Sequence, residues 1–292
     1  MMIRLDRMDL DDVGGNPILL ARAVVDQIKE LKPPVPVREI AEALDIDEIR
    51  EELLDGLEGC LITPDHKGNG KILIRSDCSE KRKRFTISHE LGHYLNPYHN
   101  PQAGGGFQCA ARDMAAERFD KGNRAVQMEV EANQFASELL MPSSLLKQAM
   151  SHMTGVDLGH IIQLSDRFQV SRESVARRYV NAVDEPIALV FSRDGVIRYV
   201  KAAEGFPRLN CWNKQQLPVG SQSAKSCDLI GAVSDWHEVD GYHWLSEGLG
   251  QIVCEQTLRQ ENGFRMTLLA LADPPDDVEL EDEWRAPSFA KR

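Results

Sequence analysis

Residues 89–93, His-Glu-Leu-Gly-His, combine the residue types and the spacing of a metal site. On a helix, two histidines four residues apart lie on one face, one turn apart, and both reach one ion. Zinc suits this arrangement because it accepts neutral imidazole nitrogens and imposes little geometric preference of its own. Glu90 lies about a third of a turn from His89 and can reach a water on the metal without ligating. The segment therefore predicts a zinc site with His89 and His93 as ligands and Glu90 as the catalytic residue.

A third ligand is expected from residues 129–136, Glu-Val-Glu-Ala-Asn-Gln-Phe-Ala. A catalytic zinc needs three protein ligands and one open position. Glu129 and Asn133 are four residues apart on a predicted helix, so one can ligate while the other hydrogen-bonds a ligand histidine from behind. Glu131 lies roughly 200° from Glu129 around that helix and is expected to point elsewhere.

His99 offers an alternative third ligand. Residues 89–99 have the spacing His-Glu-x-x-His-x-x-Asn-x-x-His, in which Asn96 stands where metzincins usually have glycine. Pro97 and the lack of a convincing Met-turn favour Glu129 over His99.

Two helices must carry these residues. Ser79 is a good N-cap for a helix that includes His89 and His93 and must end near Pro97. A second helix is predicted over residues 124–140, ending at Met141-Pro142. Residues 61–62 and 71–75 are predicted strands on either side of a turn. An extended substrate could pair with the edge of the strand at 71–75, unless this is an ordinary internal strand.

Residues 165–178 indicate a helix, a turn and a helix. Arg172, Arg177 and Arg178 could meet phosphates, as in a DNA-binding helix-turn-helix. The alternative is that the helix pair packs against the domain before it. The net charge of −12 favours packing and argues against a general nucleic-acid binder.

The composition indicates a cytoplasmic protein of two domains. The chain has 292 residues, of which 42% are hydrophobic, enough for a sizeable core. The six cysteines are scattered without a Cys-x-x-Cys pair, so free thiols in a reducing compartment are expected. Cys109 could instead bind the zinc as an inhibitory thiolate, although a free thiol is favoured. The sequence contains neither a membrane-spanning run nor a secretory signal.

The pattern changes near residues 184–186 from helical to alternating, strand-like segments. Asp194-Gly195 and Asn262-Gly263 are hairpin turn signals between such segments. The C-terminal half contains several aromatic residues, which could bind a ligand or simply form a core. They are Phe206, Trp212, Trp236, Tyr242 and Trp244.

Residues 84–95 and 129–142 together closely resemble the ImmA/IrrE family of metallopeptidases, and the resemblance covers about residues 15–182. It implies a gluzincin-like fold with zinc held by two histidines and a glutamate, and it places the third ligand on Glu129. Known members cleave helix-turn-helix repressors and so activate mobile-element transfer or DNA-damage responses. The long loop at 96–123 and the strand-rich C-terminal half depart from the shared core.

We therefore expect an α+β protein with a zincin-like, gluzincin-type peptidase domain at 1–157 and a helix-turn-helix-like segment at 158–184. A strand-rich α+β domain for sensing or interaction follows at 185–272, and an acidic tail at 273–292. The expected activity is zinc-dependent endopeptidase cleavage of a helix-turn-helix repressor. The alternative is a DNA-binding or sensory regulator whose zinc site is not proteolytic.

Regulation is expected from two places. The loop at 96–123 contains Gly104-Gly105-Gly106 and could close over the zinc as a lid. The domain after residue 185 could receive a small-molecule or protein signal. The sequence does not identify the substrate, its cleavage site, the signal, the oligomeric state or the residue that stabilises the transition state.

Overall fold

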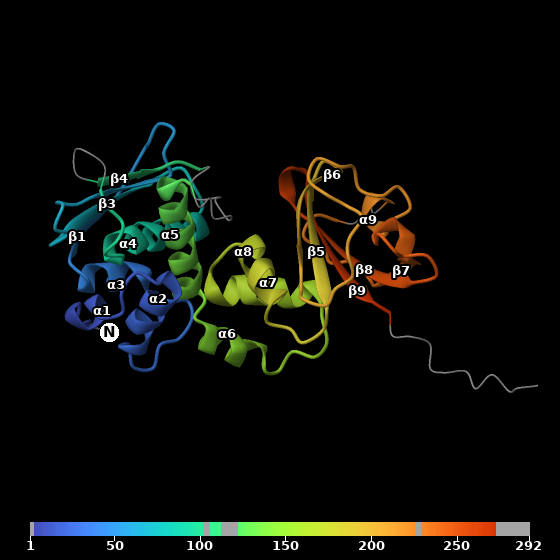
Figure 1. The fold of residues 1–292 in the computed structure, drawn as a ribbon, viewed down its shortest axis with the longest axis horizontal. Coiled ribbons are helices and arrows are strands. Elements are labelled where there is room, and N and C mark those ends of the chain that lie inside the picture. The colour runs from blue at the N-terminus through green and yellow to red at the C-terminus, as the bar shows by residue number, and fades with distance from the viewer. Residues whose placement is uncertain (1–2, 102–105, 112–121, 226–228, 273–292) are drawn as a thin grey trace, which may run out of the picture. The chain divides into compact units, whose positions relative to one another are not determined.

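A computed structural model describes residues 3–101, 106–111, 122–225 and 229–272. The chain divides into two units, Met1–Ala182 and Val183–Arg292, and each combines helices with a sheet (Figure 1). The predicted α+β class and the sheet-rich C-terminal region are confirmed. The predicted acidic tail and half of the predicted lid, including Gly104-Gly105, lie outside the described residues.

The first unit contains a four-stranded sheet in the order β1-β3-β2-β4. β1 runs parallel to β3, whereas β2 is antiparallel to both β3 and β4. The strands are β1 (Ile46–Glu52), β2 (Gly59–Ile62), β3 (Gly70–Arg75) and β4 (Gly106–Cys109). β2 and β3 match the sequence prediction. β1 is rich in charged residues and β4 follows a run of glycines, so neither has a clear strand pattern.

The strand β3 cannot receive a substrate at its edge. Its residues pair with β1 on one side and with β2 on the other. The expectation that residues 71–75 offer a free edge is therefore wrong. Within the described residues, β4 pairs only with β2 and forms one edge of this sheet.

Eight helices of the first unit are described: α1 (Met8–Asp11), α2 (Pro17–Asp26), α3 (Val37–Ala43), α4 (Glu80–Leu95), α5 (Arg124–Leu140), α6 (Ser143–Met150), α7 (Leu158–Phe168) and α8 (Arg172–Tyr179). α4 packs on β2 and β3 and against α5 (Figure 1). Side-chain caps begin the two long helices, since Ser79 accepts a hydrogen bond from the Arg82 amide and Asn123 accepts one from the Val126 amide.

α7 and α8 form the helical pair expected from the sequence and pack within the first unit. Gln169 ends α7 in the left-handed conformation, with φ 53°, and Ser171 caps α8. Two of the arginines considered for phosphate contacts are already engaged. Arg178 forms a salt bridge with Glu138 at 2.9 Å, and Arg177 pairs with Glu173 at 2.9 Å.

The second unit is built on a five-stranded antiparallel sheet in the order β6-β5-β9-β8-β7. Its strands are β5 (Ile187–Arg193), β6 (Val196–Ala202), β7 (His237–Asp240), β8 (Ile252–Arg259) and β9 (Phe264–Leu271), with the short helix α9 (Gln222–Lys225) before β7. Both hairpin signals lie in turns. Asp194-Gly195 and Asn262-Gly263 all have positive φ, which type I′ turns require.

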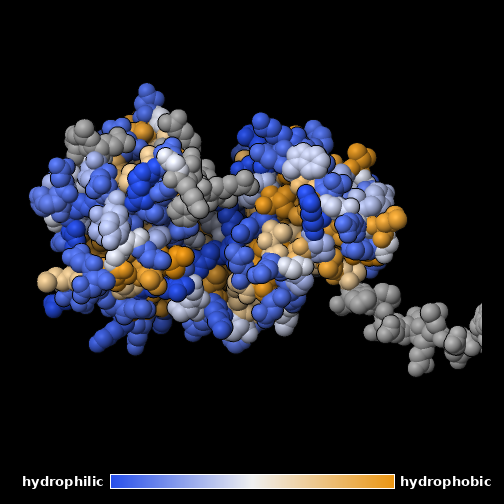
Figure 2. Space-filling model, in the orientation of Figure 1, coloured by the Kyte–Doolittle hydropathy of each residue, from blue (hydrophilic) through white to orange (hydrophobic). Residues whose placement is uncertain are grey.

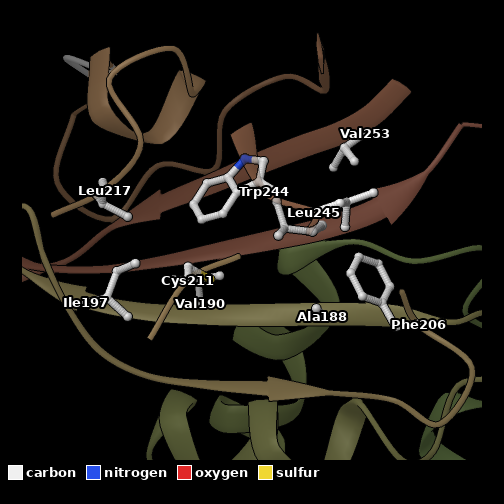
Figure 3. Close-up of a cluster of buried hydrophobic side chains, with 10 residues drawn as sticks. Ala188, Val190, Ile197, Phe206, Cys211, Leu217, Trp244, Leu245 and Val253 are labelled. Atoms are coloured by element: carbon white, nitrogen blue, oxygen red, sulfur yellow. The ribbon is translucent and has the colours of Figure 1, made fainter. Parts of the chain in front are cut away.

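The aromatic residues of the second unit divide into two groups. Trp244 and Phe206 are buried in a cluster on the sheet that also includes Val190, Ile197 and Leu245 (Figure 3). Trp212, Trp236 and Tyr242 are instead at the surface.

Further exposed hydrophobic residues lie on the second unit (Figure 2). They are Val219, Leu229, Ile230, Leu249, Ile252 and Leu271. Of the helices described in either unit, none is both long and apolar enough to cross a membrane.

Candidate metal centre

The two long helices approach each other closely where the metal motif lies. A Cβ atom at Gly92 would be 3.1 Å from the Phe135 ring and 3.2 Å from the Cα of Ala132, so glycine permits the close packing of α4 against α5. His89 and His93 face α5 from this contact. Glu129 and Asn133, one turn apart on α5, face them in return.

Three side chains converge as ligands of one ion would. The Nε2 atoms of His89 and His93 are 3.1 Å apart, and the Glu129 carboxylate lies 3.1 Å from the first and 3.5 Å from the second. Ligands about 2.0–2.1 Å from a tetrahedral zinc are about 3.3 Å from one another. The arrangement therefore fits zinc at these residues.

The far side of each imidazole is fixed by a hydrogen-bond acceptor. The Oδ1 of Asn133 lies 2.9 Å from Nδ1 of His89, and Nδ1 of His99 lies 3.0 Å from Nδ1 of His93. The Nε2 of His99 in turn lies 2.7 Å from Glu131. If the Glu131 carboxylate accepts the Nε2 proton of His99, then Nδ1 of His99 accepts the Nδ1 proton of His93. Both metal-facing Nε2 atoms then present lone pairs.

His99 therefore lies behind the candidate ligand His93, on the side away from Glu129. It is buried, and burial lowers its pKa to about 2, so the ring is neutral and can accept a proton from His93. Both of its nitrogens are engaged, by His93 and by Glu131. The arrangement favours Glu129 over His99 as the third ligand. Glu131, which was expected to point away from the metal, instead orients His99.

Glu90 is buried beside the three ligands with both carboxylate oxygens lacking a hydrogen-bond partner. Burial raises its pKa to about 7; His89 and the Cys109 thiol act in the opposite direction. Buried polar groups without partners are rare in proteins. This one fits a metal centre, where a water on the ion would supply the missing partner.

The space for Glu90 is provided by Gly59 on β2. A Cβ atom at Gly59 would contact Thr86 and would lie 2.6 Å from Oε1 of Glu90. No side chain fits at this position without moving the carboxylate. Gly59 is thus a site residue that the motif alone does not reveal, because its role depends on where β2 crosses α4.

The side chains of His93 and Glu129 have the protonation states that metal binding would require. Burial lowers the pKa of His93 to about 4, which keeps the imidazole neutral near pH 7. Burial also tends to raise the pKa of Glu129, but hydrogen bonds from His89 and His93 outweigh it and hold this pKa far below its usual range. A neutral imidazole and an ionised carboxylate are the ligand forms that bind zinc.

Lys67 and Phe107 hold the second histidine from the other side. The Lys67 amine donates to the carbonyl oxygens of His93 and Asn96, each at 2.7 Å, at the end of α4. The Phe107 ring stacks on the His93 imidazole with the centroids 4.5 Å apart. These contacts fix the position of His93 together with His99.

Cys109 completes the group of potential ligands. Its Sγ and ligand atoms of His89, His93 and Glu129 all lie within 4.8 Å of one another. The sequence offers this position for Cys109 only as a less favoured alternative to a free thiol, because Cys109 lies outside any recognisable motif. Within the described residues, no other group of this kind is found.

The helices, the sheet and the convergent ligands together define a metallopeptidase-type site. Residues 41–179 match the family model Peptidase_M78, described as an IrrE N-terminal-like domain. This match supports the assignment of the domain to the ImmA/IrrE family of peptidases, which the motifs predict.

A comparison of the whole chain with solved structures finds a similar fold. A solved structure of a Mycobacterium tuberculosis transcriptional regulator is similar over 93% of this chain and 82% of that chain, with a TM-score of 0.55. The two sequences are 13% identical, so the likeness concerns the fold alone. Comparison with curated proteins gives no match.

Proposed function

We propose that this protein is a zinc-dependent endopeptidase that cleaves a helix-turn-helix transcriptional repressor. The observation that carries the proposal is the convergence of His89, His93 and Glu129 at 3.1–3.5 Å, beside the buried and unpartnered carboxylate of Glu90. Three protein ligands leave a fourth position for water, as catalytic zinc sites do. The convergence also supports a zincin-like fold for the first unit.

The residues of the chain divide the work of peptide hydrolysis. Zinc, when bound, lowers the pKa of water and polarises a carbonyl group. Glu90 accepts a proton from the attacking water and returns a proton to the leaving amine. Its pKa, raised by burial to about 7, suits both steps near neutral pH. His99 and Asn133 hold the ligand histidines in the required tautomers.

The substrate class follows from the resemblance to the ImmA/IrrE family, whose known members cleave helix-turn-helix repressors. Within the described residues, β4 forms an edge of its sheet, where an extended peptide could add as a further strand. Cleavage of a repressor would link the peptidase to mobile-element transfer or a stress response.

Co-expression with helix-turn-helix repressors encoded nearby, with and without DNA damage, tests this proposal. The full-length chain is expected to convert one repressor into two fragments. Glu90→Gln keeps the size of the side chain but removes its basicity, so it is expected to retain zinc and abolish cleavage. Complete cleavage by Glu90→Gln would reject the assigned role of this residue.

The alternative, a non-proteolytic DNA-binding regulator, is less well supported. Of the arginines at α8, Arg177 and Arg178 are paired with carboxylates, and Arg178 also donates to Ser143. These contacts indicate that α8 packs against the rest of its unit, with Arg177 and Arg178 bound to protein groups rather than available for phosphates. Salt-dependent binding of the full chain to duplex DNA would favour the alternative.

For the C-terminal unit we propose a sensing or recruiting role. A pocket of about 420 Å³ lies between its hairpin turns, lined by Asp194, Gln216, Arg259 and Arg265 among others. Its volume lies within the range of small-molecule sites, roughly 300–1,000 Å³. A signal acts on the peptidase if it favours one conformation over another. Identical signal dependence of cleavage in the full chain and in a version ending near Asp184 would exclude this role.

A further inference from the structure

Cys109 lies at the metal centre but has no part in the proposed hydrolysis. Its side chain is fully buried, and its Sγ belongs to the same group of atoms as the ligands His89, His93 and Glu129. Thiolate sulfur is one of the ligands that zinc prefers, together with imidazole nitrogen and carboxylate oxygen. The four side chains are a complete donor set for a tetrahedral zinc.

The register of β4 explains why the thiol faces the ligands. Phe107 and Cys109 are buried on one face of the strand, whereas Gln108 between them is exposed. Cys109 is paired with Gly59 on β2, and directly paired residues point to the same side of a sheet. Since Gly59 has no side chain, the thiol and the Glu90 carboxylate share the space on this side.

We propose that Cys109 is a fourth zinc ligand that closes the metal centre and holds the peptidase in a latent state. The inference rests on the proposed function, because it requires a metal at His89, His93 and Glu129. A zinc with four protein ligands has no open position for water. Activation then consists of exchanging the thiolate for water at this position.

Ligation by Cys109 leaves every proton accounted for. The S–H bond breaks, a bond from sulfur to zinc forms, and the proton is released to solvent, as happens whenever a protonated side chain becomes a zinc ligand. The thiolate then occupies the position that water would take.

The geometry requires a small contraction. Nitrogen and sulfur ligands on one tetrahedral zinc are about 3.6 Å apart, whereas the four donor atoms extend to 4.8 Å. Ligation therefore requires the Cys109 sulfur to approach the other three donor atoms by about 1 Å. If Cys109 instead serves only to fill the core beneath the sheet, its side chain remains a thiol when metal binds.

Cobalt substitution of the full-length chain separates the two cases. Co²⁺ replaces zinc in such sites, and a thiolate ligand adds a sulfur-to-cobalt charge-transfer absorption in the near ultraviolet. We expect this absorption in the wild type and in Cys60→Ser, a control on the neighbouring strand β2, where Cys60 is only partly buried and outside the ligand group. We expect its loss in Cys109→Ser, with the visible cobalt bands retained.

Zinc affinity gives an independent readout by competition with a chromogenic chelator. Cys109→Ser is expected to weaken zinc binding by at least about tenfold, the lower bound seen when even an outer partner of a metal ligand is lost. Cys60→Ser is expected to leave the affinity unchanged. Once a cleavable repressor is available, Cys109→Ala saturated with zinc is expected to cleave it faster than the wild type.

The outcomes distinguish this inference from the proposed function. Stoichiometric cobalt with visible bands but no charge-transfer absorption in the wild type would overturn the role of Cys109 and leave the three-ligand centre intact. Failure of the wild type to bind Co²⁺ or Zn²⁺ would overturn both. Circular dichroism of each variant shows whether the fold is retained, and Cys109→Ala provides a second substitution if the serine variant does not fold.

Discussion

His99 offers a sensitive test of how the metal centre is organised. Replacing His99 by leucine removes the acceptor 3.0 Å from Nδ1 of His93 and separates Glu131 from the site. The His93 ring then keeps a buried N–H without a partner. A buried group left unsatisfied costs about 1–3 kcal/mol.

This cost would weaken zinc binding, because a zinc ligand must keep one tautomer and one orientation, which His99 fixes for His93. Loss of a partner behind a metal ligand typically weakens binding by about 10- to 100-fold, or roughly 1.4–2.8 kcal/mol. The two magnitudes agree. We therefore expect His99→Leu to bind zinc about 10- to 100-fold more weakly while still reaching one ion per chain at saturation.

Competition with a chromogenic chelator measures the affinity, and elemental analysis measures the stoichiometry. His99→Asn is expected to fall between the wild type and His99→Leu, since its amide oxygen can replace the lost acceptor. The exposed His66 provides the control His66→Leu, with unchanged affinity expected. Complete loss of zinc from His99→Leu in a folded protein would refute the reasoning and make His99 a direct ligand.

Three further substitutions test other parts of the structure. Glu129→Ala is expected to reduce the zinc content strongly in elemental analysis; an unchanged zinc content would remove Glu129 from the ligand set. Gly59→Ala is expected to keep zinc but to lower the rate of repressor cleavage, because the new Cβ would lie 2.6 Å from Glu90; an unchanged rate would contradict this role.

The substitution Glu138→Gln tests how much the buried Glu138 carboxylate contributes to the stability of the fold. Its carboxylate is buried, which raises its pKa, but Arg178 and other partners lower it further, to below 4.5. The stabilisation is thus present above pH 4.5 and is lost as pH falls through the folded-state value. Chemical denaturation is expected to show a loss of about 1–3 kcal/mol at pH 7 and a shallower decline in acid than the wild type; equal stability at pH 7 would contradict it.

The parts of the fold that could be predicted from the sequence are those with local signals. Ser79 and Asn123 cap α4 and α5, and Pro97 follows the end of α4, so caps and a helix breaker indicate both long helices. The paired turns at Asp194-Gly195 and Asn262-Gly263 indicate the hairpins in the same way. The four-residue spacing of His89 and His93 likewise depends on one helix only.

Features that depend on long-range packing could not be predicted in this way. β1 is a strand because it pairs with β3, although its own residues are mostly charged. Residues 71–75 have a suitable strand pattern, but the pattern does not show that both edges of β3 are paired. Cys109 reaches the metal centre only because β4 pairs with β2 in one register.

The central claim is that His89, His93 and Glu129 hold one zinc ion. A crystal of the full-length chain grown with zinc, measured on both sides of the zinc absorption edge, tests it directly. The account predicts a single anomalous peak in the first unit, about 2.0–2.2 Å from Nε2 of both histidines and from a carboxylate oxygen of Glu129. A peak bound by His99 in place of Glu129, or no peak between α4 and α5, would contradict it.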